Sequence, residues 1–70
     1  MEKFTLRPDE DYIQLNDLLK VLNWVGSGGE AKIHISEGLV TVNDEVETRV
    51  RKKVRTGDRI SFNGQEATVA

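Results

Sequence analysis

Residues 15–38 read LNDLLKVLNWVGSGGEAKIHISEG, and this stretch decides the fold because it predicts two helices in succession. Four leucines recur at the spacing i, i+3, i+4 and i+7, which places them on one face of an α-helix. They are Leu15, Leu18, Leu19 and Leu22. Asn16 is the candidate N-cap of this first helix, and we expect the helix to end near Gly26.

The second helix is marked by the segment SGGE at 27–30. Ser27 followed three residues later by Glu30 fits a capping box, in which each residue satisfies a free backbone N–H of the other. The helix should run over 28–37 and end at Gly38 in the left-handed conformation. A linker of two or three residues would then join the helices into an αα-hairpin, with Ala31 and Ile35 facing the first helix.

After Gly38 the sequence changes period, because valines alternate with polar residues along LVTVNDEVETRV at 39–50. This alternation is typical of β-strands. Asn43-Asp44 and Asn63-Gly64 are expected at tight hairpin turns, and FTL at 4–6 at an edge strand. The sequence therefore predicts an α+β fold, an αα-hairpin packed on a small antiparallel β-sheet, as one domain over residues 1–70.

Composition excludes several classes of function. The chain has no cysteine and one histidine, so neither disulfides nor a histidine-based metal site are expected. No segment approaches the ~18 apolar residues of a membrane span, and the first residues lack the apolar run of a signal peptide. We therefore expect a cytoplasmic protein without a cofactor. No nucleophile–base pair suggests an enzyme, and GSGG at 26–29 lacks the Lys-Ser or Lys-Thr of a nucleotide-binding loop.

Charge is unevenly distributed along the chain. Residues 1–48 carry a net charge of −6 and residues 49–70 a net charge of +4, although the whole chain is at −2. The positive charge is concentrated in ETRVRKKVRTGD at 47–58. Its five cations are Arg49, Arg51, Lys52, Lys53 and Arg55. Because salt screens charges beyond roughly 8–10 Å, an anionic partner would respond to this run and not to the net charge.

If residues 49–55 were extended, their side chains would alternate between two faces of the strand. Arg49, Arg51, Lys53 and Arg55 would lie on one face about 6.5–7 Å apart, a spacing of the same order as that of phosphates along a nucleic-acid strand. Val50 and Val54 would face the core. The alternative is a solvated edge strand, charged to prevent aggregation. Spacing alone does not separate these two interpretations.

The order of motifs resembles a known family. The chain contains four segments in order: LNDLL, SGGEAK, Ile-x-x-Gly-x-Val-x-Val-Asn and Val-x-x-Gly-Asp-x-Ile. Their order and gaps over residues 13–62 resemble the RNA-binding domain named after ribosomal protein S-four, which is also called the alpha-L motif. The residues in register are Leu15, Leu19, Ser27, Ala31, Ile35, Gly38, Val40, Val42, Asn43, Val54, Gly57, Asp58 and Ile60. Within the family the chain looks most like the short, stand-alone YbcJ type, which shares DLLK at 17–20, Trp24 and ETR at 47–49.

The resemblance implies a bacterial, cytoplasmic protein that binds structured RNA, ribosomal RNA or transfer RNA. We also expect a monomer, with ribosomal proteins as further partners. Carried over by position, the RNA-binding residues are Ser27, Gly28, Lys32, Arg49, Arg51, Lys52, Lys53 and Arg55, with Lys20 as a possible addition. Three departures stand out: the general family has Arg at Gly28, Gly at Asp44, and Arg-Leu-Asp at 14–16.

The remaining aromatic residues are assigned to packing. Trp24, Phe4 and Phe62 are expected in the core and His34 in a partly buried position, whereas Tyr12 has no assignment.

Two other functions compete with RNA binding. The acidic half of the chain could serve a protein-interaction adaptor, through Asp9, Glu10, Asp11 and Asp17. The segment 42–62 also resembles part of ubiquitin-like sulfur carriers, but the chain ends EATVA instead of in the Gly-Gly that those proteins require.

Overall fold

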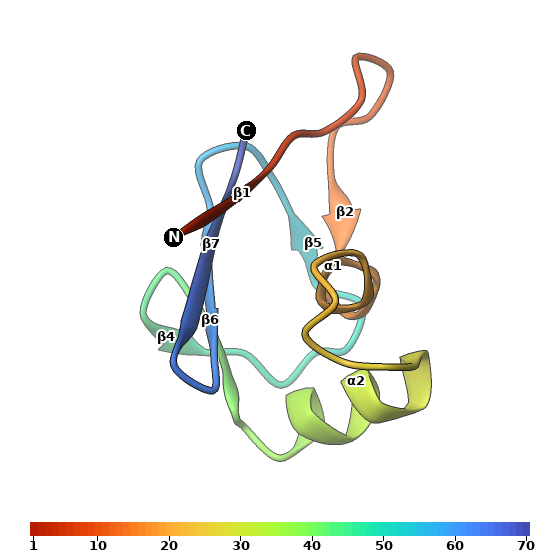
Figure 1. Cartoon of the computed structure of the whole chain (residues 1–70), viewed down its shortest axis with the longest axis vertical. Helices are drawn as coiled ribbons and strands as arrows, with labels where there is room; N and C mark the ends of the chain where they lie inside the picture. The colour runs from red at the N-terminus through yellow and green to blue at the C-terminus, as the bar shows by residue number, and fades with distance from the viewer.

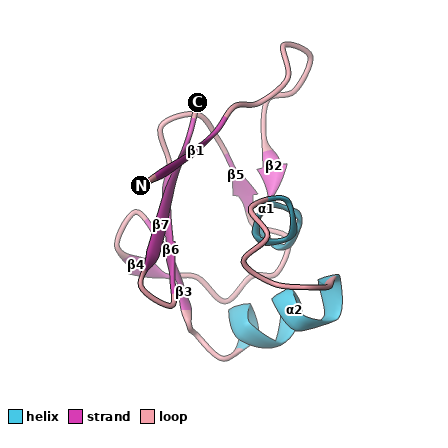
Figure 2. Ribbon diagram, viewed as in Figure 1, coloured by secondary structure: helices cyan, strands magenta, loops and turns pink.

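The computed structural model describes all residues, 1–70, and places two helices on one side of a five-stranded sheet (Figures 1 and 2). The elements in chain order are β1 (Glu2–Phe4), β2 (Ile13–Gln14), α1 (Leu15–Val21), α2 (Gly28–Ser36), β3 (Val40–Val42), β4 (Glu45–Val46), β5 (Lys53–Val54), β6 (Arg59–Phe62) and β7 (Gln65–Val69). The predicted α+β class is confirmed. Neither helix has the length and apolar run needed to cross a membrane.

The sheet has the strand order β1-β7-β6-β3-β4 and is mixed, because β1 runs parallel to β7 whereas the other neighbours are antiparallel. The N-terminal strand covers 2–4 and not the expected 4–6. A separate two-stranded ribbon pairs β2 with β5. The sequence did not indicate β2, because a strand of two residues is too short to show a period.

The first helix starts differently from the prediction. Gln14 is the N-cap residue and makes no side-chain cap, while Asn16 lies inside the helix. The N–H groups of Leu15 and Asn16 donate instead to the backbone carbonyls of Lys52 (2.9 Å) and Val50 (3.1 Å). The choice of Asn16 as N-cap was wrong because a distant backbone segment satisfies the free amides that a cap would otherwise bind.

The first helix also ends earlier than expected. Asn23 takes the left-handed conformation with φ 61°, and the N–H groups of Asn23 and Trp24 return to the carbonyls of Lys20 and Leu19. These two bonds form a Schellman motif, which usually uses glycine but accepts asparagine. Asn23 therefore does what was assigned to Gly26, and the linker between the helices is longer than two or three residues. In Figure 1, α1 is seen nearly end-on and α2 lies across the view, so the helices cross steeply.

The second helix agrees with the prediction. Ser27 caps it by accepting from the Glu30 N–H at 3.2 Å, and Gly38 has φ +76°. The Glu30 carboxylate completes the cap by accepting from the N–H of Gly26 at 2.6 Å, one residue before the partner expected in a capping box. The turns at 43–44 and 63–64 have positive φ at both central residues, as the hairpin prediction requires.

The core lies between the helices and the sheet. Its members are Leu15, Leu18, Leu19, Val25, Ala31, Ile35, Val40, Val42, Val54, Ile60, Phe62 and Val69. Phe4, Trp24 and Val50 pack against it while remaining partly exposed. The His34 ring lies 5.0 Å from that of Phe62, in the expected packing position.

Helix α2 offers a matched test of this core. Ile35 is completely buried, whereas Ile33 on the same helix is 56% exposed. We expect Ile35→Ala to lower the free energy of unfolding by about 2–5 kcal/mol, because it removes buried methyl groups and leaves a cavity. Ile33→Ala should change it by no more than about 0.5 kcal/mol. Urea denaturation would measure both, with Ile35→Val as a milder variant if Ile35→Ala does not fold. Equal losses at the two positions would contradict the assigned face of α2.

Candidate nucleic-acid interface

The segment Arg49–Arg55, which we call the basic turn, is not the extended row expected from its sequence. The N–H of Lys52 donates to the carbonyl of Arg49 at 3.2 Å, so residues 49–52 form a turn, and β5 contains only Lys53 and Val54. The inward placement of the valines is confirmed, since Val54 is completely buried and Val50 packs against the core. The extended conformation is excluded because the backbone bends to bring the carbonyls of Val50 and Lys52 to the start of α1.

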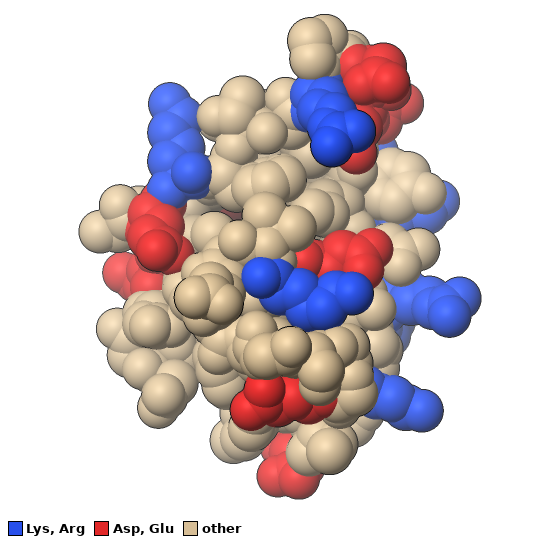
Figure 3. Space-filling view, turned by 45° about the vertical axis from the view of Figure 1, so that its right-hand side comes forward, with Lys and Arg blue, Asp and Glu red and all other residues tan.

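This bend brings all five cations of the basic turn together. Arg49, Arg51, Lys52, Lys53 and Arg55 alone line an open depression of ≈ 490 Å³. An extended strand would have sent Lys52 to the opposite face. In Figure 3, several blue side chains follow one another down the right-hand edge of the molecule. On the surface that faces the viewer, red and blue side chains are interspersed. The five cations of the basic turn thus surround one open depression.

Two acidic residues at the ends of the basic turn shape its backbone. Glu47 accepts from the N–H of Arg49 at 3.0 Å, and Asp58 accepts from the N–H of Arg55 at 2.8 Å. Asp58 also accepts from the side-chain amide of Asn43, at 2.9 Å, which joins this end of the turn to the β3–β4 hairpin. The carboxylates therefore act on the backbone that presents the cations.

Glu47 also pairs with the side chain of Arg49. Its two oxygens receive Arg49 Nε (2.9 Å) and Nη2 (3.1 Å), and its side chain is only 13% exposed. The hydrogen bond from Arg49 holds the pKa of Glu47 below its ordinary value of 4.5 and raises the pKa of Arg49. Arg49 is thus partly neutralised, whereas the other four cations of the basic turn form no ion pair.

The other predicted contacts lie at the far end of α1. Ser27 and Gly28 begin α2, and the ammonium of Lys20 lies 3.8 Å from where a Cβ on Gly28 would be. Lys20 is also 3.7 Å from Asp17. Lys32 is exposed on α2. Because the basic turn meets the first residue of α1 and Lys20 is near its last, the two groups lie at opposite ends of this helix of seven residues, which is about 10 Å long.

Tyr12 is a residue of this surface that the sequence did not assign. Its ring lies 5.0 Å from Lys53 Nζ and 5.7 Å from the guanidinium carbon of Arg55. Both distances are within the reach of a cation–π contact. No local signal links Tyr12 to residues 53 and 55, because the contact depends on the unpredicted pairing of β2 with β5.

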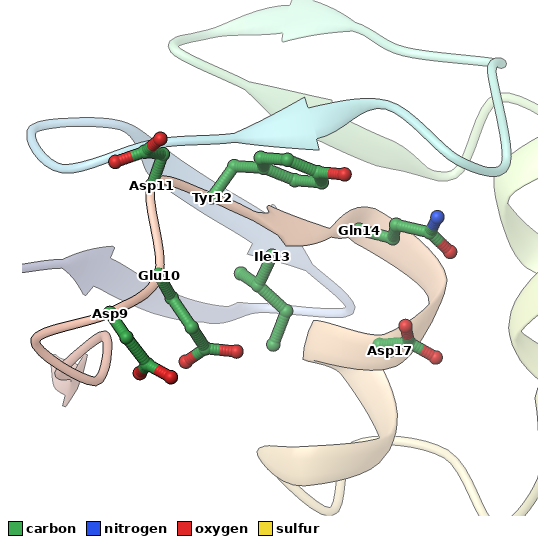
Figure 4. Close-up of a pocket in the computed structure, with 7 residues that line it drawn as sticks. All are labelled: Asp9, Glu10, Asp11, Tyr12, Ile13, Gln14 and Asp17. Carbon is green, nitrogen blue, oxygen red and sulfur yellow. The ribbon is translucent and has the colours of Figure 1, made fainter.

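An acidic depression of ≈ 430 Å³ adjoins the basic turn, and Tyr12 is one of the residues that line it. Asp9, Glu10, Asp11 and Asp17 also line it, and in Figure 4 Asp9 and Glu10 extend to one side of β2 whereas Asp11 lies on the side of the Tyr12 ring. No group of three or more His, Asp or Glu side chains is arranged to hold a metal ion. Cationic and acidic surfaces therefore adjoin, with Tyr12 at their boundary.

A helix pair on a small mixed sheet, with a cationic turn joined to the first helix, defines the class of the S4 domain. The S4 domain model matches residues 6–70, and the chain belongs to this family, which confirms the resemblance seen in its motifs. It is 47% identical to YbcJ of Escherichia coli (strain K12) over 58 residues, 83% of each chain. The solution structure of E. coli YbcJ, described as having an alpha-L motif involved in RNA-binding, matches with a TM-score of 0.76 at 43% identity, over 100% of this chain and 87% of that one.

A second relative comes from another bacterium. The chain is 39% identical over 56 residues to RlbA of Bacillus subtilis (strain 168), which is named a "Probable ribosome maturation protein". The aligned residues cover 80% of this chain and 79% of RlbA.

The pairing of Glu47 with Arg49 predicts a pH dependence of stability. A carboxyl whose pKa is lowered by folding stabilises the fold above its unfolded pKa and loses that contribution as the pH falls through its folded pKa. Wild type should therefore be more stable than Glu47→Gln at pH 7, and the difference should shrink as the pH falls below 4.5. Urea denaturation of both proteins across this range would measure it. Glu45→Gln, an exposed acid two residues away, is the control and should show no such loss.

Proposed function

We propose that this protein binds structured RNA, ribosomal or ribosome-associated, through contacts between the basic turn and RNA phosphates. The observation that carries the proposal is the depression lined only by five cations. The description of the alpha-L motif in YbcJ supports RNA as the ligand, and the name of RlbA supports a link with the ribosome. We further propose that the protein acts as a monomer in the cytoplasm and that it neither catalyses a reaction nor carries a cofactor.

The energetic basis is electrostatic. Four of the five cations have no carboxylate partner and lie close enough to repel one another when nothing is bound. A phosphate backbone relieves this repulsion and releases its own condensed counterions, so that binding is favourable at low salt and weakens as salt rises. The net charge of −2 does not decide the binding, because salt screens charges beyond roughly 8–10 Å and a phosphate responds chiefly to the charges nearest to it.

The form of RNA follows from the shortage of free aromatic rings. Single-strand binding surfaces stack bases on exposed aromatic residues. Here Trp24 packs against the core and donates to Glu2 at 2.8 Å, and Phe62 is buried. Only Tyr12 is exposed, and cations occupy its ring. A helical RNA, which offers phosphates and 2′-hydroxyls, is the better partner.

The proposed contacts differ in weight. Arg51, Lys52, Lys53 and Arg55 make the main phosphate contacts, and Arg49 contributes less because Glu47 shares its charge. Ser27, Gly28 and Lys32 form a second contact beyond the far end of α1, reached by a different part of the RNA. Lys20 is a minor contributor because it is paired with Asp17.

The acidic depression favours a second candidate function. The four acidic residues that line this depression suit a basic segment of a protein partner such as a ribosomal protein. This adaptor role can accompany RNA binding, although the two surfaces meet at Tyr12, which lines the acidic depression and whose ring contacts Lys53 and Arg55. The sulfur-carrier alternative has no comparable support.

Removal of one unpaired cation tests the RNA proposal. We expect Arg51→Gln to weaken binding of a fluorescent RNA hairpin with a paired stem, and to reduce the slope of log affinity against log salt by about one. Arg7→Gln removes the same charge from an exposed loop outside the basic turn, and should leave the affinity and slope almost unchanged. Fluorescence anisotropy at several salt concentrations would measure both. Absence of binding by the wild type at low salt, or equal losses in the two variants, would contradict the proposal.

A further inference from the structure

The register of the β2–β5 ribbon places Tyr12 on the outer face of the basic turn. Ile13 pairs with Val54 and Gln14 with Lys53, so Tyr12, directly before β2, lies opposite Arg55. Val54 is buried and Ile13 packs against the core. Because side chains alternate along a strand, Tyr12, Lys53 and Arg55 share the other face. Figure 4 shows the Tyr12 ring lying alongside the neighbouring strand, whereas Asp9 and Glu10 extend to the opposite side of β2.

The ring interacts with both cations of this face. Lys53 Nζ is 5.0 Å and the guanidinium carbon of Arg55 is 5.7 Å from its centroid. The negative face of an aromatic ring attracts cations, which offsets the repulsion between two positive side chains on one strand face. Flexible Lys and Arg side chains otherwise lose conformational freedom when they bind, so an arrangement already made in the free protein favours binding.

Tyr12 has no evident role in the core. The residue is 36% exposed, and it is absent from the core and from the apolar residues that pack against it. Lys53 lies in β5 and Arg55 follows directly after it and Val54, so the two cations leave the same face of the ribbon two residues apart and meet the same ring.

We propose that Tyr12 is a positioning residue for RNA binding, whose ring holds the ammonium of Lys53 and the guanidinium of Arg55 on the outer face of the β2–β5 ribbon, ready to meet neighbouring phosphates. This role rests on the proposed function. In this role the Tyr12 ring contacts the two cations and does not stack on a base of the RNA.

The test compares Tyr12→Leu with Tyr12→Phe, which keeps the ring and removes only the hydroxyl. We expect Tyr12→Leu to weaken binding of the labelled RNA hairpin roughly three- to tenfold, and Tyr12→Phe to remain within about twofold of the wild type. Urea denaturation should give similar stabilities for all three proteins. Wild-type affinity in Tyr12→Leu, or an equal loss in Tyr12→Phe, would overturn the proposal.

Two further readouts separate positioning from other roles of Tyr12. In the free protein, ring-current shifts should move the side-chain protons of Lys53 and Arg55 upfield in the wild type and in Tyr12→Phe, but not in Tyr12→Leu. Lys53→Gln combined with Tyr12→Leu should weaken binding by less than the product of the single losses, because both changes remove the same arrangement. Independent, multiplicative losses would indicate a direct contact between the ring and the RNA, and would overturn positioning.

The RNA-binding measurement and the spectroscopic measurement test different proposals. A wild-type protein that does not bind the hairpin at low salt overturns the proposed function and, with it, the RNA role of Tyr12. A wild type that binds, without ring-current shifts at Lys53 and Arg55, overturns the positioning role alone.

Discussion

The hydrogen bonds from the N–H groups of Leu15 and Asn16 to the carbonyls of Lys52 and Val50 are the constraint on which the rest of the structure depends. They give the free amides at the start of α1 partners that no side chain supplies, and they bend the segment that follows the β3–β4 hairpin. The same bend gathers the cations around one depression. Helix start and cationic surface are thus two consequences of one set of backbone contacts, so a change that unravels one should disturb the other.

Acidic residues support the cationic surface. Glu47 and Asp58 stand at its two ends, and each accepts a backbone N–H from a basic residue, Arg49 or Arg55. Only Glu47 also pairs with a guanidinium, so four cations stay unpaired. Carboxylates that bind backbone amides order the turn while neutralising little of its charge. This arrangement explains how an overall acidic chain can present a concentrated positive surface.

The sequence predicted the elements whose evidence is local. The helical spacing of the leucines, the Ser27 cap and the Asn43-Asp44 turn each depend on a few neighbouring residues, and each has the expected conformation or burial. The errors arose where distant segments meet. Asn16 is not a cap because residues 50–52 reach the helix start, and the basic run is not extended for the same reason. Tyr12 was left unassigned because its contacts cross the β2–β5 ribbon.

The two ends of α1 carry different amounts of free charge, which bears on the departure from the family at Gly28. A Cβ there would meet Lys20 at 3.8–4.0 Å, ordinary contact distances, so packing does not require glycine at the start of α2. The Lys20 ammonium instead lies beside the position from which the arginine of the general family would extend. Because Asp17 shares the charge of Lys20, this end offers one paired cation and Lys32, where the other end offers four unpaired cations. With glycine in place of that arginine, the larger share of the unpaired positive charge lies at the basic turn.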